Sequence, residues 1–133
     1  MTAATFDRDR VVRLLARDVS RTLGERFRDD VLAVAANVEE LAIGWMAPPD
    51  GEGYGRVETP YPVERVQESF DQKVVDDFQQ YVMDTHVHTT WPPCPRHPNH
   101  PLEYAVEHDA WCCPRDGAAI ARLGELPPPA GAD

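Results

Sequence analysis

Residues 91–126 read WPPCPRHPNHPLEYAVEHDAWCCPRDGAAIARLGEL. They hold most of a cluster in which all three cysteines and all five histidines of the 133-residue chain lie between His86 and Cys113. An odd number of cysteines, in a chain whose N-terminal residues do not resemble an export signal, argues against a disulfide framework. The cluster therefore predicts metal binding or reactive thiol chemistry, and the other segments are interpreted around it.

The cluster contains two similar tetrapeptides, CPRH at residues 94–97 and CPRD at residues 113–116. In such a turn the sulfur of the first residue accepts backbone hydrogen bonds, and the residue three positions later faces the same centre, as in structural zinc sites. Between the two turns, residues 102–106 and 110–112 are predicted to form a short hairpin that turns near His108 and Asp109. Residues 118–123 are predicted to add a third strand.

Tetrahedral zinc needs four ligands. The ligands that we predict are Cys94, His97, His100 and Cys113. Asp116, Cys112 and His88 are the alternatives for the fourth position, Asp116 because it follows Cys113 at the same spacing as His97 follows Cys94. A site with two cysteines and two histidines also suits iron. Because a module of about 35 residues buries too little apolar surface to fold unaided, metal binding and folding of this segment are expected to be one event.

The run Trp-Pro-x-Cys-Pro-x-His, followed by Trp-x-Cys-Pro and Ile-Ala-x-Leu-Gly-Glu-Leu, resembles C-terminal zinc-ribbon segments of small bacterial proteins of unassigned function. The resemblance covers residues 91–126, about a quarter of the chain. It implies a compact β module stabilised by metal, and it implies no particular activity. The sequence differs from the commonest ribbon in having no C-x-x-C pair.

Two amphipathic helices are predicted before the cluster. From Asp9 to Leu23, apolar residues occupy one side of a helical wheel and four arginines the other, with Gly24 as the stop. The arginine row is interpreted as a solvated face, with an acidic partner or phosphates as the alternative. A second apolar stripe, from Val63 to about Met83, predicts a helix that packs on the first.

The segment between these helices is ambiguous. Residues 31–46 fit a helix, which we favour, and also a β-hairpin that turns near Asn37. Residues 47–62 are rich in Pro, Gly and Asp and predict a surface loop. The expected fold is therefore α+β, with a helical N-terminal body over residues 1–90, a zinc ribbon over residues 91–126 and a disordered tail over residues 127–133.

The charge of the chain restricts its partners. The net charge is −10, with thirteen acidic and three basic residues between positions 29 and 90. This balance argues against a general nucleic-acid-binding protein and favours a basic protein partner. No apolar run reaches the ~20 residues that cross a bilayer, so we expect a cytoplasmic protein without a membrane anchor. Arginine outnumbers lysine twelve to one, a bias typical of GC-rich bacterial genomes.

These features favour a non-enzymatic adaptor with a structural zinc that binds another protein. A thin core of two or three helices also favours self-association as a homo-oligomer. Two alternatives remain open. Residues 84–88 read D-x-H-x-H, which resembles the metal-binding strand end of amidohydrolase-type enzymes, so His86 and His88 are candidates for a zinc-dependent hydrolase. A nucleic-acid-binding zinc ribbon would have to rely on Arg96 and Arg115.

Overall fold

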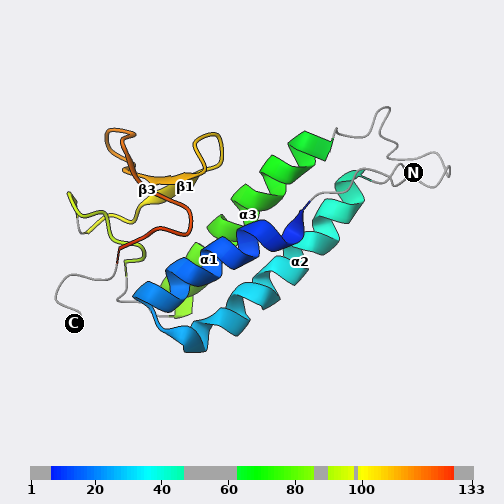
Figure 1. Cartoon of the computed structure of the whole chain (residues 1–133), viewed down its shortest axis with the longest axis horizontal. Helices are drawn as coiled ribbons and strands as arrows, with labels where there is room; N and C mark the ends of the chain where they lie inside the picture. Colours follow the sequence, from blue (N-terminus) through cyan, green and yellow to red (C-terminus); the bar gives the residue numbers. More distant parts are fainter. Residues whose placement is uncertain (1–6, 47–62, 86–89, 98, 128–133) are drawn as a thin grey trace, which may run out of the picture.

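The computed structural model describes residues 7–46, 63–85, 90–97 and 99–127, and these residues have an α+β fold (Figure 1). Its helices are α1 (Arg8–Thr22), α2 (Arg28–Met46) and α3 (Val63–Thr85), with a short 3₁₀ helix η1 (Glu25–Phe27) between the first two. The strands are β1 (Glu103–Ala105), β2 (Ala110–Cys112) and β3 (Ala119–Arg122). The predicted loop, His86, His88 and all but the first residue of the predicted tail lie outside the described residues.

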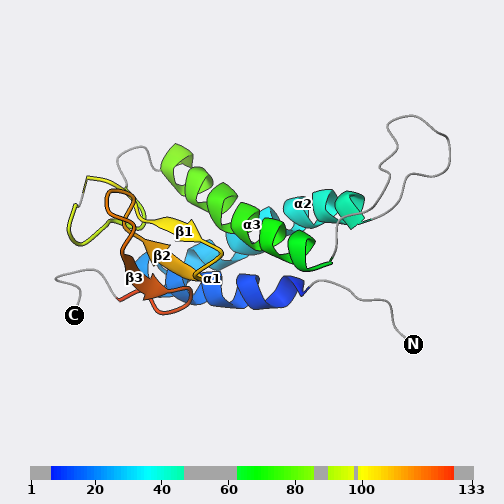
Figure 2. The same cartoon turned by 90° about the horizontal axis from the view of Figure 1, so that it is seen from above.

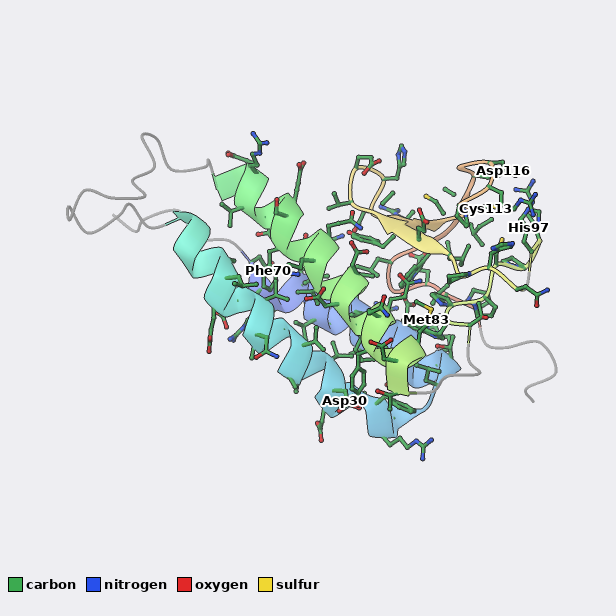
Figure 3. The ribbon with its side chains drawn as sticks, turned by 180° about the vertical axis from the view of Figure 1, so that it is seen from behind. Asp30, Phe70, Met83, His97, Cys113 and Asp116 are labelled. Atoms are coloured by element: carbon green, nitrogen blue, oxygen red, sulfur yellow. The ribbon has the colours of Figure 1, made fainter. Side chains whose placement is uncertain are left out.

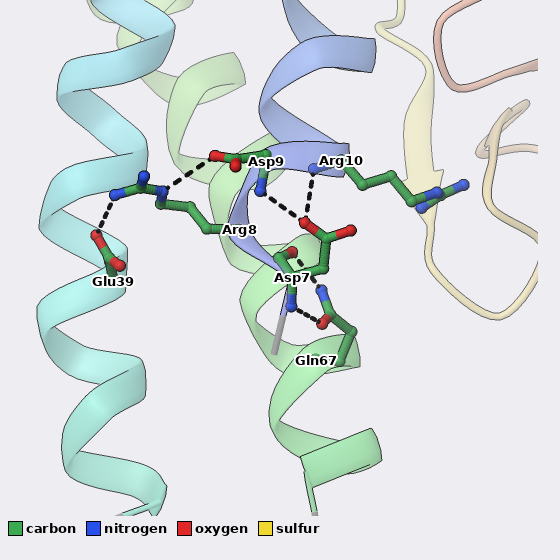
Figure 4. A network of polar contacts seen from close by, with 6 residues as sticks. All are labelled: Asp7, Arg8, Asp9, Arg10, Glu39 and Gln67. Carbon is green, nitrogen blue, oxygen red and sulfur yellow. Dashed lines mark hydrogen bonds and ion pairs between the residues drawn. The ribbon is translucent and has the colours of Figure 1, made fainter. Parts of the chain in front are cut away.

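Hydrogen bonds and an ion pair connect the N-terminus of α1 to both other helices (Figure 4). Asp7 is the N-cap, and its carboxylate accepts hydrogen bonds from two backbone N–H groups of the first turn. Gln67 of α3 bonds to the backbone of Asp7 on both sides, at 2.5 Å to its N–H and 2.9 Å to its carbonyl oxygen. Arg8 pairs with Glu39 of α2 at 3.0 Å. These contacts fix the end of α1 against α2 and α3.

The predicted end of the first helix is confirmed. Leu23 caps α1 through its N–H, which donates to the carbonyl of Val19 at 2.7 Å. Gly24 follows with φ of 112°, a conformation that residues with a Cβ rarely adopt. The chain therefore turns at Gly24 and enters η1 and α2.

The hairpin alternative for residues 31–46 is wrong, because this segment belongs to the single helix α2. Val31, Ala35, Val38 and Ala42 are all buried, and they recur at the spacing of one helical face. A hairpin would have sent alternate side chains to opposite sides of a sheet, whereas these four residues all join the core shared with α1 and α3.

The three strands form an antiparallel sheet in the order β1-β2-β3, which confirms the predicted hairpin and third strand with slightly shorter bounds. Trp111 in the central strand lies opposite Tyr104 of β1 and Ala121 of β3. Seen from above, the sheet lies beside the helices with β1 nearest α3 (Figure 2). The sheet and the helices share one hydrophobic core.

Aromatic rings connect the two parts of this core. Phe78 of α3 makes an edge contact with Trp91, and Trp91 makes another with Trp111, at centroid separations of 5.6 and 5.5 Å. Such edge-to-face pairs add to the stabilisation that burial alone provides. The segment predicted as a separate module is therefore packed continuously against the helical body. Within the described ranges, no helix has the length and apolar character needed to span a membrane.

Candidate metal centre

Two tight turns shape the candidate centre, one at each CPR sequence. In the first, the N–H of His97 donates to the carbonyl of Cys94 at 3.1 Å. In the second, the N–H of Gly117 donates to the carbonyl of Cys113 at 2.8 Å, and Gly117 has a φ of 76°. The first turn is closed by a bridge between Pro93 and Pro101, and the second joins β2 to β3. The second turn places Asp116 close to Cys113, and the first turn places His97 close to both.

The two turns bring metal-binding atoms together (Figure 3). A nitrogen of His97, the sulfur of Cys113 and a carboxylate oxygen of Asp116 all lie within 4.8 Å of one another. Cys113 is buried, His97 is half-buried and Asp116 is exposed. The cluster therefore lies at the tips of the two loops and reaches the surface on one side.

Cys94 adjoins this group through Cys113. Burial alone would raise the pKa of the Cys94 thiol. Hydrogen bonds from the backbone N–H groups of Arg96 and His97, the contact with the Cys113 thiol and the charge of Arg96 outweigh that effect, so the pKa is lowered. Backbone N–H groups directed at a sulfur stabilise the thiolate, which is the form that binds metal.

Asp116 is held as a carboxylate by its surroundings. The backbone N–H of Ala118 donates to it at 2.9 Å and lowers its pKa, and the Cys113 thiol and Arg96 act in the same direction. Arg96, from the other turn, forms an ion pair with Asp116 at 2.5 Å. The two CPR sequences are thus joined by a charge pair as well as by their potential ligands.

The structure groups two of the four predicted ligands, His97 and Cys113, and Cys94 adjoins them through the contact of its thiol with that of Cys113. The fourth, His100, has an exposed side chain and is not among the grouped donors of the described residues. Its backbone carbonyl instead accepts a hydrogen bond from the N–H of Cys94, which closes the first turn. Asp116, an alternative in the sequence analysis, lies where a fourth donor is needed. His88 lies outside the described residues.

Cys112, the other alternative that the structure describes, serves the sheet. It is buried in β2, and its thiol donates to the carbonyl of Ala110 in the same strand at 3.7 Å. Burial raises the pKa of this thiol, and the nearby carboxylates of Glu107 and Glu103 act in the same direction. Both effects keep Cys112 protonated and make it a weaker metal ligand than Cys94.

A buried carboxylate that the sequence analysis missed connects the sheet to α1. Asp18 has no exposed surface and accepts hydrogen bonds from Trp111 Nε1 and the N–H of Gly124, both at 2.8 Å, and from the N–H of Leu126 at 2.9 Å. Burial raises the pKa of Asp18, while these hydrogen bonds oppose the rise. A charged residue at positions i+3 and i+7 from the buried Leu15 and Val11 was the available signal, because it places an acid on the apolar face.

Two glutamines of α3 hold the other side of the β segment. Gln79 is buried and donates to the carbonyl oxygens of Trp91 and Leu102, at 3.1 and 2.6 Å. Gln72, two turns earlier, donates to the carbonyl of Tyr104 at 2.7 Å and accepts from the N–H of Val106 at 3.0 Å. The loops that carry the candidate ligands therefore start from a backbone anchored to both α1 and α3.

No protein-family model, curated protein or solved structure matches this chain. Its function is therefore inferred from the geometry of the residues that the structure describes.

Proposed function

We propose that this chain is a non-enzymatic zinc-binding interaction protein, in which one structural zinc closes the two CPR turns into a zinc ribbon. The observation that carries this proposal is the convergence of His97, Cys113 and Asp116 within 4.8 Å, next to Cys94. Two thiolates, an imidazole and a carboxylate are all established zinc ligands.

The spacing of the donors is suited to zinc. With bonds of about 2.0–2.3 Å in a tetrahedron, the donor atoms of a zinc site lie about 3.3–3.8 Å apart. From their limit of 4.8 Å, the grouped donors need to close by at most about 1.0–1.5 Å. His97 and Asp116 are only partly buried or exposed, so rotation of their side chains can provide that movement.

The charge around the site supports Asp116 as the fourth ligand. A zinc ion with two thiolates, one carboxylate and a neutral imidazole carries a net charge of about −1, whereas a second imidazole in place of the carboxylate makes it neutral. Arg96 lies 2.5 Å from Asp116 and would offset the additional negative charge. The proposed ligands are therefore Cys94, His97, Cys113 and Asp116, one residue different from the set expected from the sequence.

Four protein ligands favour a structural role for the zinc. A catalytic zinc keeps one position open for water or substrate, and this set fills all four. The metal would instead hold the loop tips together and stabilise the surface around them. The acidic outer residues of α3, among them Glu64, Glu68 and Asp84, support the expectation of a basic protein partner.

Native mass spectrometry of protein purified without chelator or affinity-tag metal tests this proposal. We expect one zinc per chain, with a mass that distinguishes zinc from iron. Cys113→Ser and Asp116→Asn should lose the zinc, whereas His100→Gln should keep it. If Asp116→Asn keeps the zinc and His100→Gln loses it, the fourth ligand is His100 and the structural zinc stands.

The same measurement separates the alternatives. A double variant with His86→Ala and His88→Ala should retain one zinc per chain, because neither residue belongs to the proposed set. Loss of the metal in this double variant would favour the hydrolase alternative. Full zinc retention in both Cys94→Ser and Cys113→Ser would refute the proposed site.

A further inference from the structure

A groove between α1 and α2 is lined mainly by arginines and apolar side chains. It has a volume of about 620 Å³ and contains Val12 and Ala16 of α1 and Leu32 of α2 among its lining residues. Leu32 is 56% exposed although it is apolar. The two helices lie side by side along it (Figure 1). The groove is separate from the candidate metal centre, whose residues are not part of its lining.

The groove concentrates positive charge on a strongly acidic protein. Arg13, Arg17, Arg21 and Arg28 line it. Arg21 donates to the carbonyl of Leu126, but the other three have no ion pair or hydrogen-bonding partner among the residues that the structure describes. Three arginines outside the groove, Arg8, Arg10 and Arg96, are paired with carboxylates. Unpaired guanidinium groups that share one groove favour an anionic ligand.

The carboxylates of the groove leave its middle basic. Asp9 belongs to the first turn of α1 and Glu25 to η1, just beyond the last turn of that helix. Their places in the chain put them at opposite ends of α1, with Arg13, Arg17 and Arg21 between them. A ligand that lies along α1 therefore meets arginines over its central part.

The spacing and the apolar lining indicate the class of ligand. Arg13, Arg17 and Arg21 recur every four residues, which is a repeat of about 6 Å along the helix axis. A second helix with acidic residues at i, i+4 and i+8 presents carboxylates at the same repeat. Leu32 and Val12 provide contact surface for its apolar residues, and none of the aromatic residues that the structure describes lines the groove to stack on nucleic-acid bases.

We propose that this arginine groove binds an acidic amphipathic helix of a partner protein. Guanidinium groups pair with the carboxylates of the helix, and Leu32 and Val12 contact its apolar side, as in other helix-in-groove complexes. The proposal names a partner class for the interaction role proposed above, but it does not depend on the metal. An acidic partner would bind in the groove, whereas the basic partner proposed above would bind at the acidic outer residues of α3.

Fluorescence anisotropy with a designed peptide tests the groove. The probe is a labelled, alanine-based helical peptide of about 18 residues, with Glu at three successive i, i+4 positions and Leu on the neighbouring side. The control peptide has Gln at each Glu position. We expect the Glu peptide to bind, the Gln peptide to bind at least tenfold more weakly, and added salt to weaken the binding.

Variants of the chain link this binding to the groove. Combining Arg13→Gln with Arg17→Gln should weaken binding of the Glu peptide at least tenfold, and Leu32→Ser should also weaken it. Arg122→Gln removes an exposed arginine that is outside the groove and should change the affinity less than twofold. Circular dichroism and urea unfolding of each variant establish that it is folded.

Three results would overturn the proposal: no binding of the Glu peptide, equal binding of both peptides, or binding unaffected by Arg13→Gln with Arg17→Gln in folded protein. Tighter binding of a single-stranded oligonucleotide that depends on the same arginines would also overturn it, in favour of nucleic acid. The metal proposal fails separately, because it is tested by zinc content in Cys113→Ser. If the wild-type chain, purified without chelator, carries no zinc and still binds the Glu peptide, the metal site alone is refuted.

Discussion

Replacing Asp18 with Asn should destabilise the protein even though the two side chains have nearly the same shape. One carboxylate oxygen of Asp18 accepts hydrogen bonds from Trp111 Nε1 and the N–H of Gly124, and the other accepts from the N–H of Leu126. Asparagine has one acceptor oxygen and one NH₂ group. In either orientation, the NH₂ group faces at least one buried N–H donor that has lost its acceptor.

The size of the effect follows from this loss. A buried donor without a partner costs about 1–3 kcal/mol. Burial of the charge is unfavourable, as the raised pKa of Asp18 indicates. The neutral amide of asparagine avoids this cost, and that gain offsets part of the loss. We therefore expect Asp18→Asn to lower the free energy of unfolding by about 1–3 kcal/mol, and Asp18→Ala by more, because all three donors then lose their acceptor.

Urea unfolding at pH 7, followed by tryptophan fluorescence and circular dichroism, measures this change. A loss of about 2 kcal/mol shifts the midpoint by about 1 M for a slope of about 2 kcal/mol/M. Asp29→Asn is the matched control, because Asp29 is an exposed carboxylate and should change stability by less than about 0.5 kcal/mol. A double-mutant cycle with Trp111→Phe should show non-additive losses, since the two residues share a hydrogen bond. Unchanged or increased stability in Asp18→Asn would show that the hydrogen bonds do not outweigh the cost of burying the charge.

Three further changes test other parts of the structure. Burial raises the pKa of Asp71 to about 6, against the hydrogen bond from Gln67 and the charge of Arg10. Between these pH values the folded protein holds a proton that the unfolded chain releases, so the stability contributed by Asp71 falls as pH rises from about 4 to about 6. Asp71→Asn should therefore raise the free energy of unfolding at pH 7.5 by about 1–3 kcal/mol. In urea titrations it should also flatten the dependence of stability on pH in this range. Gly124→Ala should lower the free energy of unfolding by about 2–4 kcal/mol in the same assay, because Gly124 has φ of 92° and the new Cβ would lie 2.8 Å from Leu14 Cδ2. A decrease of less than about 1 kcal/mol would contradict this packing. Chelation of the proposed zinc should lower stability by about 4 kcal/mol relative to protein with free zinc at about 1,000 times Kd, and should change tryptophan fluorescence more than helical circular dichroism; an unchanged thermal midpoint with EDTA would contradict it.

The elements with strong periodicity could be predicted from the sequence, and the ambiguous one could not. The helices α1 and α3 have clear apolar stripes, and the hairpin of β1 and β2 is bounded by turn residues. Residues 31–46 fitted two periods because apolar residues are frequent on several sides of the segment, as the exposed Leu32 and Leu41 show. Val31 and Val38 are both buried in the core shared with the other two helices, and this packing favours the helix over the hairpin.

The candidate site was predictable where local spacing determines it. The CPR sequences predicted His97 and Cys113, which the structure brings together, and in the second turn Cys113 and Asp116, three residues apart, lie in the same group of donors. The choice between His100 and Asp116 depends on the path of the chain after the first turn, where Pro101 bridges back to Pro93. The local pattern places Asp18 on the apolar face of α1, but its hydrogen-bond donors lie about a hundred residues away, so the pattern does not reveal what it binds.

The glutamine of α3 that bonds to β1 affects how the sheet meets other chains. An outer strand normally leaves a row of backbone groups open, and a strand from another molecule can pair with them. Here the side-chain amide of Gln72 donates a hydrogen bond to the carbonyl of Tyr104 and accepts one from the N–H of Val106, as a peptide group of a fourth strand would. Replacing Gln72 would therefore do more than remove two hydrogen bonds. It would open an edge to intermolecular β-pairing, and aggregation of folded protein would be its sign.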